Sequence, residues 1–268
     1  MELSDTQQEI YSRQLMMKEI GEKGQEKLAG ASVLVAGCGG LGASALYYLT
    51  AAGIGHLGLC DNDTVSLSNL NRQILFTAHD VGSFKTSAAK KRLVALNPQL
   101  KVSLYNEMIE ELDNSVLKSY DIIVDCLDNF KARFYLNDAC VTAGIPFIHA
   151  GVGEFYGQLM NIIPGKSPCL RCFFPNGLPN GFPNGLLNGH ESVKIPDTPK
   201  QKKDAGPIPG IIGPIPGIIG SMQALEAIKY LLGMQIYTSG LITLDGLSLT
   251  FEKVPVTQVK TCFCNNLQ

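Results

Sequence analysis

The sequence predicts an α/β fold with a Rossmann-like sheet, mostly parallel, with antiparallel strands in its second half and helices on both faces. Two observations lead to this prediction. Up to about residue 150, apolar segments of strand length alternate with longer helical segments, the pattern of a parallel sheet covered on both faces. Beyond Gly151, strand-like segments are separated by turn residues, which favours antiparallel pairing. We expect one domain over residues 1–268.

The predicted elements of the first half follow in order. A helical stretch with an apolar stripe comes first, and a β-branched strand, a glycine turn and an Ala/Leu-rich helix follow it. Strands and helices then alternate. The predicted ranges are 9–28 (helix), 31–54 (strand, turn and helix), 56–63 (strand), 85–98 (helix, ended near Pro98), 101–109 and 119–129 (strands), 131–144 (helix) and 146–152 (strand).

The second half contains two strand-like segments, a helix and a repetitive stretch. Residues 156–165 and 240–256 are predicted strands, and 221–233 a helix with Ser221 as N-cap and Gly233 as its end. Between the first strand and this helix, Asn-Gly occurs four times and the seven-residue unit "GPIPGII" is duplicated. Such Pro-, Asn- and Gly-rich repeats favour turns, so we expect a mobile surface loop over about residues 173–220.

Composition excludes several classes of protein. The 268 residues are 45% hydrophobic and 17% charged, with a net charge of −2, as in ordinary globular proteins with a real core. Nothing in this charge indicates binding to nucleic acid or to a membrane surface. No apolar run is long enough to span a bilayer, and the first residues lack the basic-then-apolar order of a secretory signal. We therefore expect a cytoplasmic protein.

A glycine turn follows the first strand and opens a helix. "GCGGLG", Gly37 to Gly42, matches G-x-G-x-x-G in the structural context that binds phosphate, where glycines permit close approach and the helix N-terminus supplies N–H donors. An acid about twenty residues later is expected to hold a ribose hydroxyl, and Asp61 fits. This motif alone is weak, because many nucleotide-binding folds contain it.

The stretch "DNDTVSLSNLNRQ" after the second strand separates the alternatives. An NAD(P)-binding oxidoreductase needs one acid here, but Arg72 and Gln73 also occur, and Lys85 comes shortly after. Two cations beside a glycine turn suit a triphosphate, whose charge must be balanced when a P–O bond breaks. Asp128, after the fourth strand, adds a carboxylate that would hold Mg²⁺. Singly, each residue is more often a solvated or capping side chain, so the inference depends on their joint occurrence.

These segments together resemble the MoeB/ThiF/HesA family, bacterial relatives of ubiquitin-activating enzymes. The resemblance rests on "YSRQ", "GCGGLG", "DNDTVSLSNLNRQ", "GSFKTSAA", "DCLDN", "CLRC" and "GIIGSMQALEAIK", and is closest in style to molybdopterin-synthase adenylyltransferase. It implies that ATP is used to join AMP to the C-terminal Gly-Gly carboxylate of a ubiquitin-like sulfur-carrier protein, with release of pyrophosphate. Residues 1–150 would form the nucleotide-binding half and residues 151–268 the acyl-substrate half.

The resemblance also implies a role for each matching residue. Arg13 would reach into the site of the partner subunit of a homodimer, and Asp128 would serve Mg²⁺. The glycines of the turn would face the phosphates: Gly37, Gly39, Gly40 and Gly42. Asp61 would hold the ribose, and Asp63 is a further implied ATP contact. The residues around the triphosphate would be Asn69, Arg72, Gln73 and Lys85.

The eight cysteines fall into two groups. Four lie in or beside apolar segments and are predicted to be buried thiols: Cys38, Cys60, Cys126 and Cys140. The others form two close pairs, which in a cytoplasmic protein suggest a metal before a disulfide: Cys169 and Cys172 in "CLRC", and Cys262 and Cys264 in "CFC".

Together the two close pairs would make a closed, structural four-thiolate zinc site. The second pair departs from the C-x-x-C usual in the family, so four reduced thiols near the surface remain the alternative. A redox dithiol is disfavoured because "CLRC" does not open a helix after a strand.

Four other functions remain in competition with carrier adenylation. One is adenylation of a peptide carboxyl in natural-product modification, which the repetitive loop favours slightly. The others are an NAD(P)-binding oxidoreductase, a nucleotide-binding regulator without turnover, and a tRNA-dehydrating relative. Arg13, Arg72, Lys85 and Asp128 argue against a regulator, and the thiol pairs and lack of basic surplus argue against tRNA. No cysteine lies between Cys172 and Cys262, so a covalent sulfur step in that loop is not expected.

Overall fold

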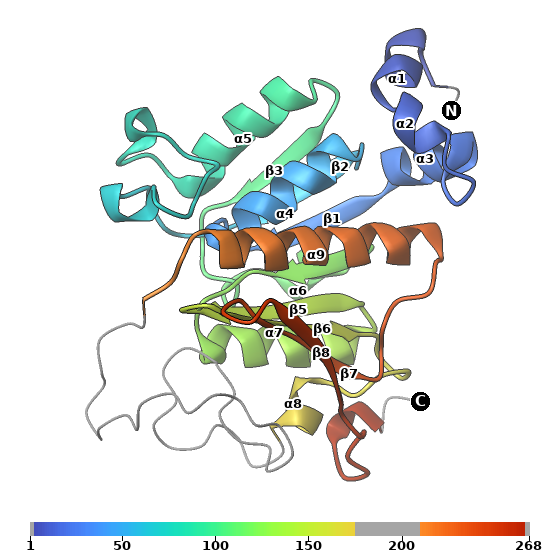
Figure 1. Ribbon diagram of the computed structural model, residues 1–268, viewed down its shortest axis with the longest axis vertical. Coiled ribbons are helices and arrows are strands. Elements are labelled where there is room, and N and C mark those ends of the chain that lie inside the picture. The colour runs from blue at the N-terminus through green and yellow to red at the C-terminus, as the bar shows by residue number, and fades with distance from the viewer. Residues whose placement is uncertain (1–2, 175–209, 266–268) are drawn as a thin grey trace.

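The computed structural model describes residues 3–174 and 210–265, and its centre is one eight-stranded sheet (Figure 1). The strand order is β3-β2-β1-β4-β5-β6-β7-β8. The first five strands in this order are parallel and the last three pair antiparallel, which confirms the predicted sheet. The strands are β1 (Ser32–Ala36), β2 (His56–Cys60), β3 (Lys101–Tyr105), β4 (Ile122–Asp125), β5 (Phe147–Gly153), β6 (Tyr156–Ile162), β7 (Gly240–Asp245) and β8 (Thr250–Pro255).

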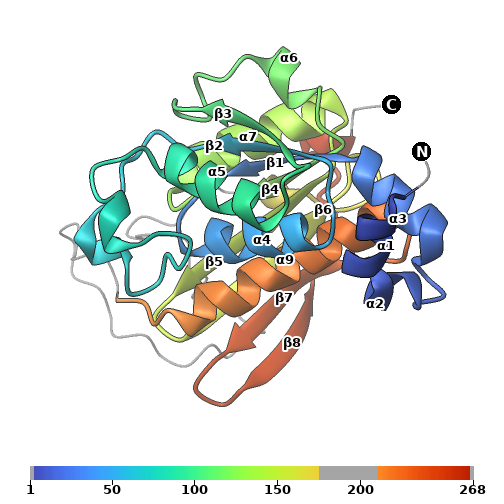
Figure 2. The same ribbon diagram turned by 90° about the horizontal axis from the view of Figure 1, so that it is seen from above.

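Helices cover both faces of this sheet (Figure 2). On one face lie α4 (Gly40–Ala51), α5 (Lys85–Leu96) and α9 (Pro214–Leu232), and on the other lie α6 (Asn114–Leu117) and α7 (Phe130–Ala143). The remaining short elements are α1 (Asp5–Ile10), α2 (Ser12–Leu15), α3 (Gly21–Gly30), α8 (Leu170–Phe173), η1 (Leu67–Asn69), η2 (Ala78–Asp80) and η3 (Phe263–Asn265).

Alternation along the central strands divides the core in two. In β1, Val33 and Val35 belong to the buried cluster under α4, α5 and α9, whereas Leu34 belongs to the cluster under α7. Successive strand side chains point to opposite faces, so the apolar run of β1 serves both layers. The four thiols predicted to be buried, Cys38, Cys60, Cys126 and Cys140, are buried.

Helix α9 starts earlier than predicted. It begins at Pro214, with Gly213 as its N-cap, and the Ser221 hydroxyl donates to the Gly217 carbonyl inside the helix; the predicted N-cap is therefore wrong. Pro is tolerated in the first helical turn because its missing N–H would be unpaired there anyway. The predicted end is confirmed, since Gly233 caps the helix with a φ of +78°.

The predicted loop over residues 173–220 is consequently too long at its end. The second copy of the duplicated unit forms the first turns of α9, and residues 175–209 lie outside the described part of the chain. Gly220 shows why glycine recurs here: a Cβ on it would lie 2.2 Å from the Leu41 carbonyl oxygen. The glycine thus permits the close packing of α9 on α4.

Two further predicted elements are divided in the structure. The expected helix over 9–28 consists of α1, α2 and α3, and Gly21, the first residue of α3, has a φ of +54°. The expected strand over 240–256 is the hairpin of β7 and β8. Within the described residues, no helix is both long and apolar enough to cross a membrane.

Candidate functional site: a pocket at the carboxyl ends of the parallel strands

A cavity of about 550 Å³ opens where β1, β2 and β4 end. Ligands of open α/β sheets bind at this edge, outside the carboxyl ends of the strands. Most residues expected to contact ATP line the cavity: Gly37, Gly39, Gly40, Asp61, Asp63, Arg72, Gln73, Lys85 and Asp128. Gly42, Asn69 and Arg13 do not line it.

The glycine turn packs too closely against its surroundings for larger residues at Gly37 and Gly42. Gly37 has a φ of +97°, and a Cβ there would lie 2.5 Å from the Cys126 carbonyl oxygen. Gly42 is structural, because a Cβ on it would lie 2.0 Å from the carbonyl oxygen of Gly37. Helix α4 begins immediately after Gly39, so its unpaired N–H groups and positive dipole end lie beside the cavity.

Asp61 is fixed by backbone donors. One carboxylate oxygen accepts a hydrogen bond from Cys38 N at 2.7 Å and the other accepts one from Asp63 N at 2.8 Å. Burial raises the pKa of Asp61, while Lys85 and these two N–H groups partly offset that effect. The carboxylate therefore has a set orientation at the cavity wall, as ribose recognition needs.

Lys85 enters the cavity from the first turn of α5. Its Nζ lies 2.7 Å from Asp63 Oδ2, and its backbone N donates to the Asp63 carbonyl at 3.0 Å. The lysine side chain is 8% exposed, whereas that of Asp63 is 61% exposed. Asp63 thus holds a nearly buried ammonium group beside the glycine turn.

The loop after β2 places the other cation. Asn69 does not reach the cavity, but its carbonyl accepts hydrogen bonds from the backbone N of Arg72 and Gln73, and its side chain accepts one from Ser66 N. Arg72 is half-buried, and its Nη1 donates to the Ser68 carbonyl at 2.9 Å. Asn69 therefore shapes the turn that presents Arg72 and Gln73.

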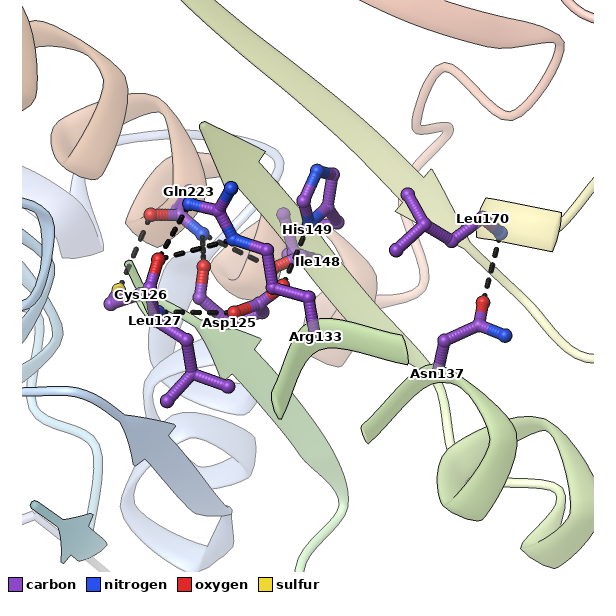
Figure 3. Close-up of polar contacts among 9 residues, drawn as sticks. All are labelled: Asp125, Cys126, Leu127, Arg133, Asn137, Ile148, His149, Leu170 and Gln223. Atoms are coloured by element: carbon purple, nitrogen blue, oxygen red, sulfur yellow. Dashed lines mark hydrogen bonds and ion pairs between the residues drawn. The ribbon is translucent and has the colours of Figure 1, made fainter. Parts of the chain in front are cut away.

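Four functional candidates, of which Arg133 lines the cavity and three lie beneath it, were missed by the sequence analysis (Figure 3). Asp125 and His149 form a fully buried pair, and Arg133 and Gln223 reach the same region from α7 and α9. Gln223 Nε2 donates to the carbonyls of Asp125 and Ile148. The available sequence pattern was His149 inside an otherwise apolar strand, since a buried polar group needs a hydrogen-bond partner.

Arg13 lies at the opposite end of the molecule. It is exposed on α2, and its neighbour Gln14 donates to the Ala52 carbonyl, just past the C-terminus of α4. The cavity is at the N-terminus of α4. Figure 1 shows α1 to α3 beyond the end of the sheet where β1 and β2 begin. Arg13 is thus not part of the cavity in its own chain.

The four cysteines of the close pairs meet at one point. Cys169, Cys172, Cys262 and Cys264 have sulfur atoms within 4.8 Å of one another, with Sγ–Sγ distances of 3.6 Å for Cys169–Cys262 and 3.4 Å for Cys172–Cys264. Three are buried and Cys262 is half-buried. Cys169 is the N-cap of α8, a helix of four residues that is separated from β6 by residues 163–168, so "CLRC" opens a helix but not directly after a strand. The set fits tetrahedral thiolate coordination.

Comparison with known proteins agrees with this geometry. The family model described as ThiF family matches residues 11–266. A sulfur carrier protein adenylyltransferase of Thermus thermophilus is 37% identical over 264 residues, covering 94% of this chain and 88% of that protein. A SAMP-activating enzyme E1 of Haloferax volcanii is 36% identical and covers 97% and 89%.

Other relatives are longer or resemble the chain in fold alone. An adenylyltransferase and sulfurtransferase MOCS3 of Drosophila persimilis is 38% identical over 92% of this chain, which spans about half (51%) of that protein. A crystal structure of E. coli MccB with succinimide superposes with a TM-score of 0.76 at 24% identity, covering 96% of this chain and 73% of that one. With a family match from "YSRQ" to the last cysteines, the chain belongs to the ThiF family.

Proposed function

We propose that the protein is an ATP-dependent adenylyltransferase. It would activate the C-terminal Gly-Gly carboxylate of a small ubiquitin-like sulfur-carrier protein as acyl-AMP and release pyrophosphate. The observation that carries this proposal is the placement of two cations, Arg72 and Lys85, and a carboxylate, Asp128, around one glycine turn. The names of the relatives from Thermus and Haloferax support the same activity.

The chemistry asks little of the enzyme beyond position and charge. The carrier's own carboxylate is the nucleophile: it forms a bond to the α-phosphorus while the bond to the pyrophosphate oxygen breaks. Arg72 and Lys85 would neutralise the charge on the phosphates, and Asp61 would hold the ribose. Bound Mg²⁺ supplies further charge neutralisation on the phosphate oxygens, and Asp128 offers the carboxylate oxygen that it prefers.

The acyl substrate would enter from the second half of the chain. Residues 151–268 contribute Gly153, Ile211 and Pro216 to the cavity wall, and residues 1–150 contribute the groups assigned to the nucleotide. We therefore propose that residues 1–150 bind the nucleotide and residues 151–268 bind the acyl substrate.

The four-cysteine cluster would hold a structural zinc ion. Four thiolates leave no open position on Zn²⁺, and the cluster lies where α8 meets the C-terminal turn η3, away from the cavity (Figure 1). The ion would join two segments far apart in the sequence. Free thiols of this kind also suit a reducing compartment such as the cytoplasm.

We also infer a homodimer, because Arg13 cannot serve the cavity of its own chain. A second copy would bring its α2 to the cavity, where its Arg13 would join the cations Arg72 and Lys85. An open apolar hollow supports this arrangement: Pro214 and Ile218 at the start of α9, Tyr48 on α4 and Ile74 line it, and Ile74 and Pro214 lie two residues from the cavity residues Arg72 and Pro216.

Pyrophosphate exchange tests the proposed function. The protein is incubated with ATP, labelled pyrophosphate and a panel of carrier proteins ending in Gly-Gly, with candidate peptides as a second panel. We expect label to enter ATP only with a carrier protein, and not with the same carrier lacking its last glycine. Exchange with a peptide instead would favour natural-product modification. No exchange together with binding of NAD(P) would favour an oxidoreductase.

A further inference from the structure

The segment that carries Asp128 connects β4 to α7 and has no regular structure of its own. Asp128 and Asn129 are exposed at the cavity, while Cys126 before them is buried. An exposed side chain has little packing of its own to hold it. The position of Asp128 is therefore set by whatever fixes the backbone on either side of it.

Arg133 holds this segment from below (Figure 3). Both Nε and Nη2 of its guanidinium donate to the Leu127 carbonyl oxygen, at 3.1 and 2.5 Å. On the other side of the same residue, Leu127 N donates to Asp125 Oδ1 at 3.1 Å. The residue before Asp128 thus has both of its backbone polar groups bound by buried side chains.

The residue after Asp128 is fixed by the start of α7. Asn129 is the N-cap, and its side chain accepts a hydrogen bond from Ala132 N at 2.9 Å. Its carbonyl accepts one from the Arg133 backbone N at 3.2 Å. Arg133 consequently contacts the segment on both sides of Asp128, once through its side chain and once through its backbone.

The burial of Arg133 is costly, which indicates a role beyond stability. Only 2% of the residue is exposed, and its Nη1 has no hydrogen-bond partner among the described residues. Burial lowers the pKa of the guanidinium, and the charges of Asp125 and Asp128 partly offset this effect. Apolar residues of similar volume often stabilise a fold as well as a buried charge does. Two hydrogen bonds from a planar guanidinium to one carbonyl oxygen, however, require arginine.

We propose that Arg133 is a positioning residue that sets Asp128 in place for the nucleotide and its magnesium ion. The proposal rests on the proposed function for the role of Asp128, but the hold on the backbone is independent of that role. It acts through the Leu127 carbonyl, although Arg133 itself also lines the cavity. Lysine at this position would keep the charge and lose the fork.

The first test needs neither nucleotide nor metal. Amide hydrogen exchange is compared between the wild-type protein and Arg133→Lys for the peptide covering residues 126–129. Loss of one of the two carbonyl contacts should speed exchange in this peptide about tenfold, the order expected for one net hydrogen bond. Peptides from β1 and β2 should exchange as before. Equal rates at residues 126–129 would overturn the proposal.

The second test measures the Mg²⁺ concentration that gives half-maximal pyrophosphate exchange. Arg133→Lys should raise this concentration several-fold and leave the KM for the carrier protein unchanged. Arg171→Lys is the matched control: its Nε and Nη2 also form a fork, to Asp138 on α7, at 2.7 and 2.5 Å. The control should not change the Mg²⁺ requirement.

A double-mutant cycle separates positioning from a general loss of stability. In an Asp128→Asn background, adding Arg133→Lys should not change further the Mg²⁺ dependence of ATP binding measured by equilibrium dialysis. A full additional effect there would show that Arg133 acts elsewhere, and would overturn the proposal. Arg133→Gln, which like lysine can donate one hydrogen bond but lacks both the fork and the charge, should have at least as large an effect as Arg133→Lys. If neither variant folds, Arg133 is needed for the fold itself and the positioning role is overturned.

Failure of the proposed function would look different. If the wild-type protein shows no pyrophosphate exchange with any substrate tested, the proposed adenylation is wrong. If Arg133→Lys nevertheless shows faster hydrogen exchange at residues 126–129, the proposal that Arg133 fixes the Asp128 segment still stands.

Discussion

His149 Nδ1 donates to Asp125 Oδ2 at 2.7 Å, and both side chains are fully buried. Burial lowers the pKa of His149, and the nearby Arg133 adds to this effect, while Asp125 opposes it. The folded protein therefore binds a proton at His149 less readily than the unfolded chain, whose histidines titrate near pH 6.5. The contribution of neutral His149 to the free energy of unfolding should therefore be fully present above pH 6.5 and should decrease as the pH falls below 6.5.

We predict that His149→Gln flattens this pH dependence. One histidine contributes at most about 1.4 kcal/mol per pH unit to the free energy of unfolding. The measurement is urea denaturation at pH 7.5, 6.5 and 5.5, and the slope of stability against pH is the readout, because the substitution also changes stability at neutral pH. His79→Gln, at an exposed position in η2, is the control. An unchanged slope in His149→Gln would contradict the assignment.

We predict that Arg72→Ala and Lys85→Ala each reduce adenylation by roughly 10² to 10³, the usual effect of removing one preorganised charged contact at a transition state. The fold should survive, since both residues line the cavity wall. Pyrophosphate exchange measures the loss, and circular dichroism checks the fold. Lys91→Ala, at an exposed position on the same helix α5 as Lys85, should retain normal activity. Near-normal exchange in both cavity variants would remove the triphosphate assignment.

We predict that Arg13 acts across a dimer interface. Arg13→Ala and Asp128→Ala should each be inactive alone, but mixing them should restore part of the activity. This is expected because some mixed dimers would contain one site with both residues intact. Subunit exchange is verified independently with two differently tagged chains. If exchange occurs and no activity returns, the site is built within one chain.

We predict about one zinc ion per chain, as a four-thiolate site requires. The double variant Cys262→Ser/Cys264→Ser should lose the metal and unfold at a lower temperature, because the binding energy of a structural site is also folding energy. Elemental analysis and thermal denaturation measure the two effects. Cys140→Ser, a buried cysteine outside the cluster, should keep the metal. Protein that is metal-free yet fully stable and active would rule the site out.

The parts of the site that follow a strand directly could be predicted from the sequence. The glycine turn after β1, Asp61 after β2 and Asp128 after β4 all lie at strand ends, and parallel strands end at one edge of the sheet. Lys85 was predicted because it is a second cation that follows Arg72 closely in the sequence. Periodicity and turn chemistry are local properties, so they suffice for these positions.

The buried polar network could not be predicted because its members come from separate strands and helices. Asp125 lies in an apolar run on β4 and His149 in another on β5, and either residue could have ended its strand. Only the pairing of β4 with β5, which sets Asp125 opposite His149, makes them partners. Similarly, the start of α9 was missed because Pro and Gly dominate its first turns, and tertiary packing on α4 outweighed their low helix propensity.

Helix α7 links the cavity to the cysteine cluster through two side chains one turn apart. Arg133 holds Leu127 at the cavity, and Asn137 Oδ1 accepts a hydrogen bond from Leu170 N in α8, at 2.8 Å, beside Cys169 (Figure 3). Four residues bring two side chains to the same side of a helix, and each residue turns it by about 100°. A single residue inserted between them would point one side chain away from its target, whereas an insertion after Ala143 would leave both in register. Both contacts therefore require the four-residue spacing between Arg133 and Asn137, which makes this turn of α7 intolerant of insertion or deletion.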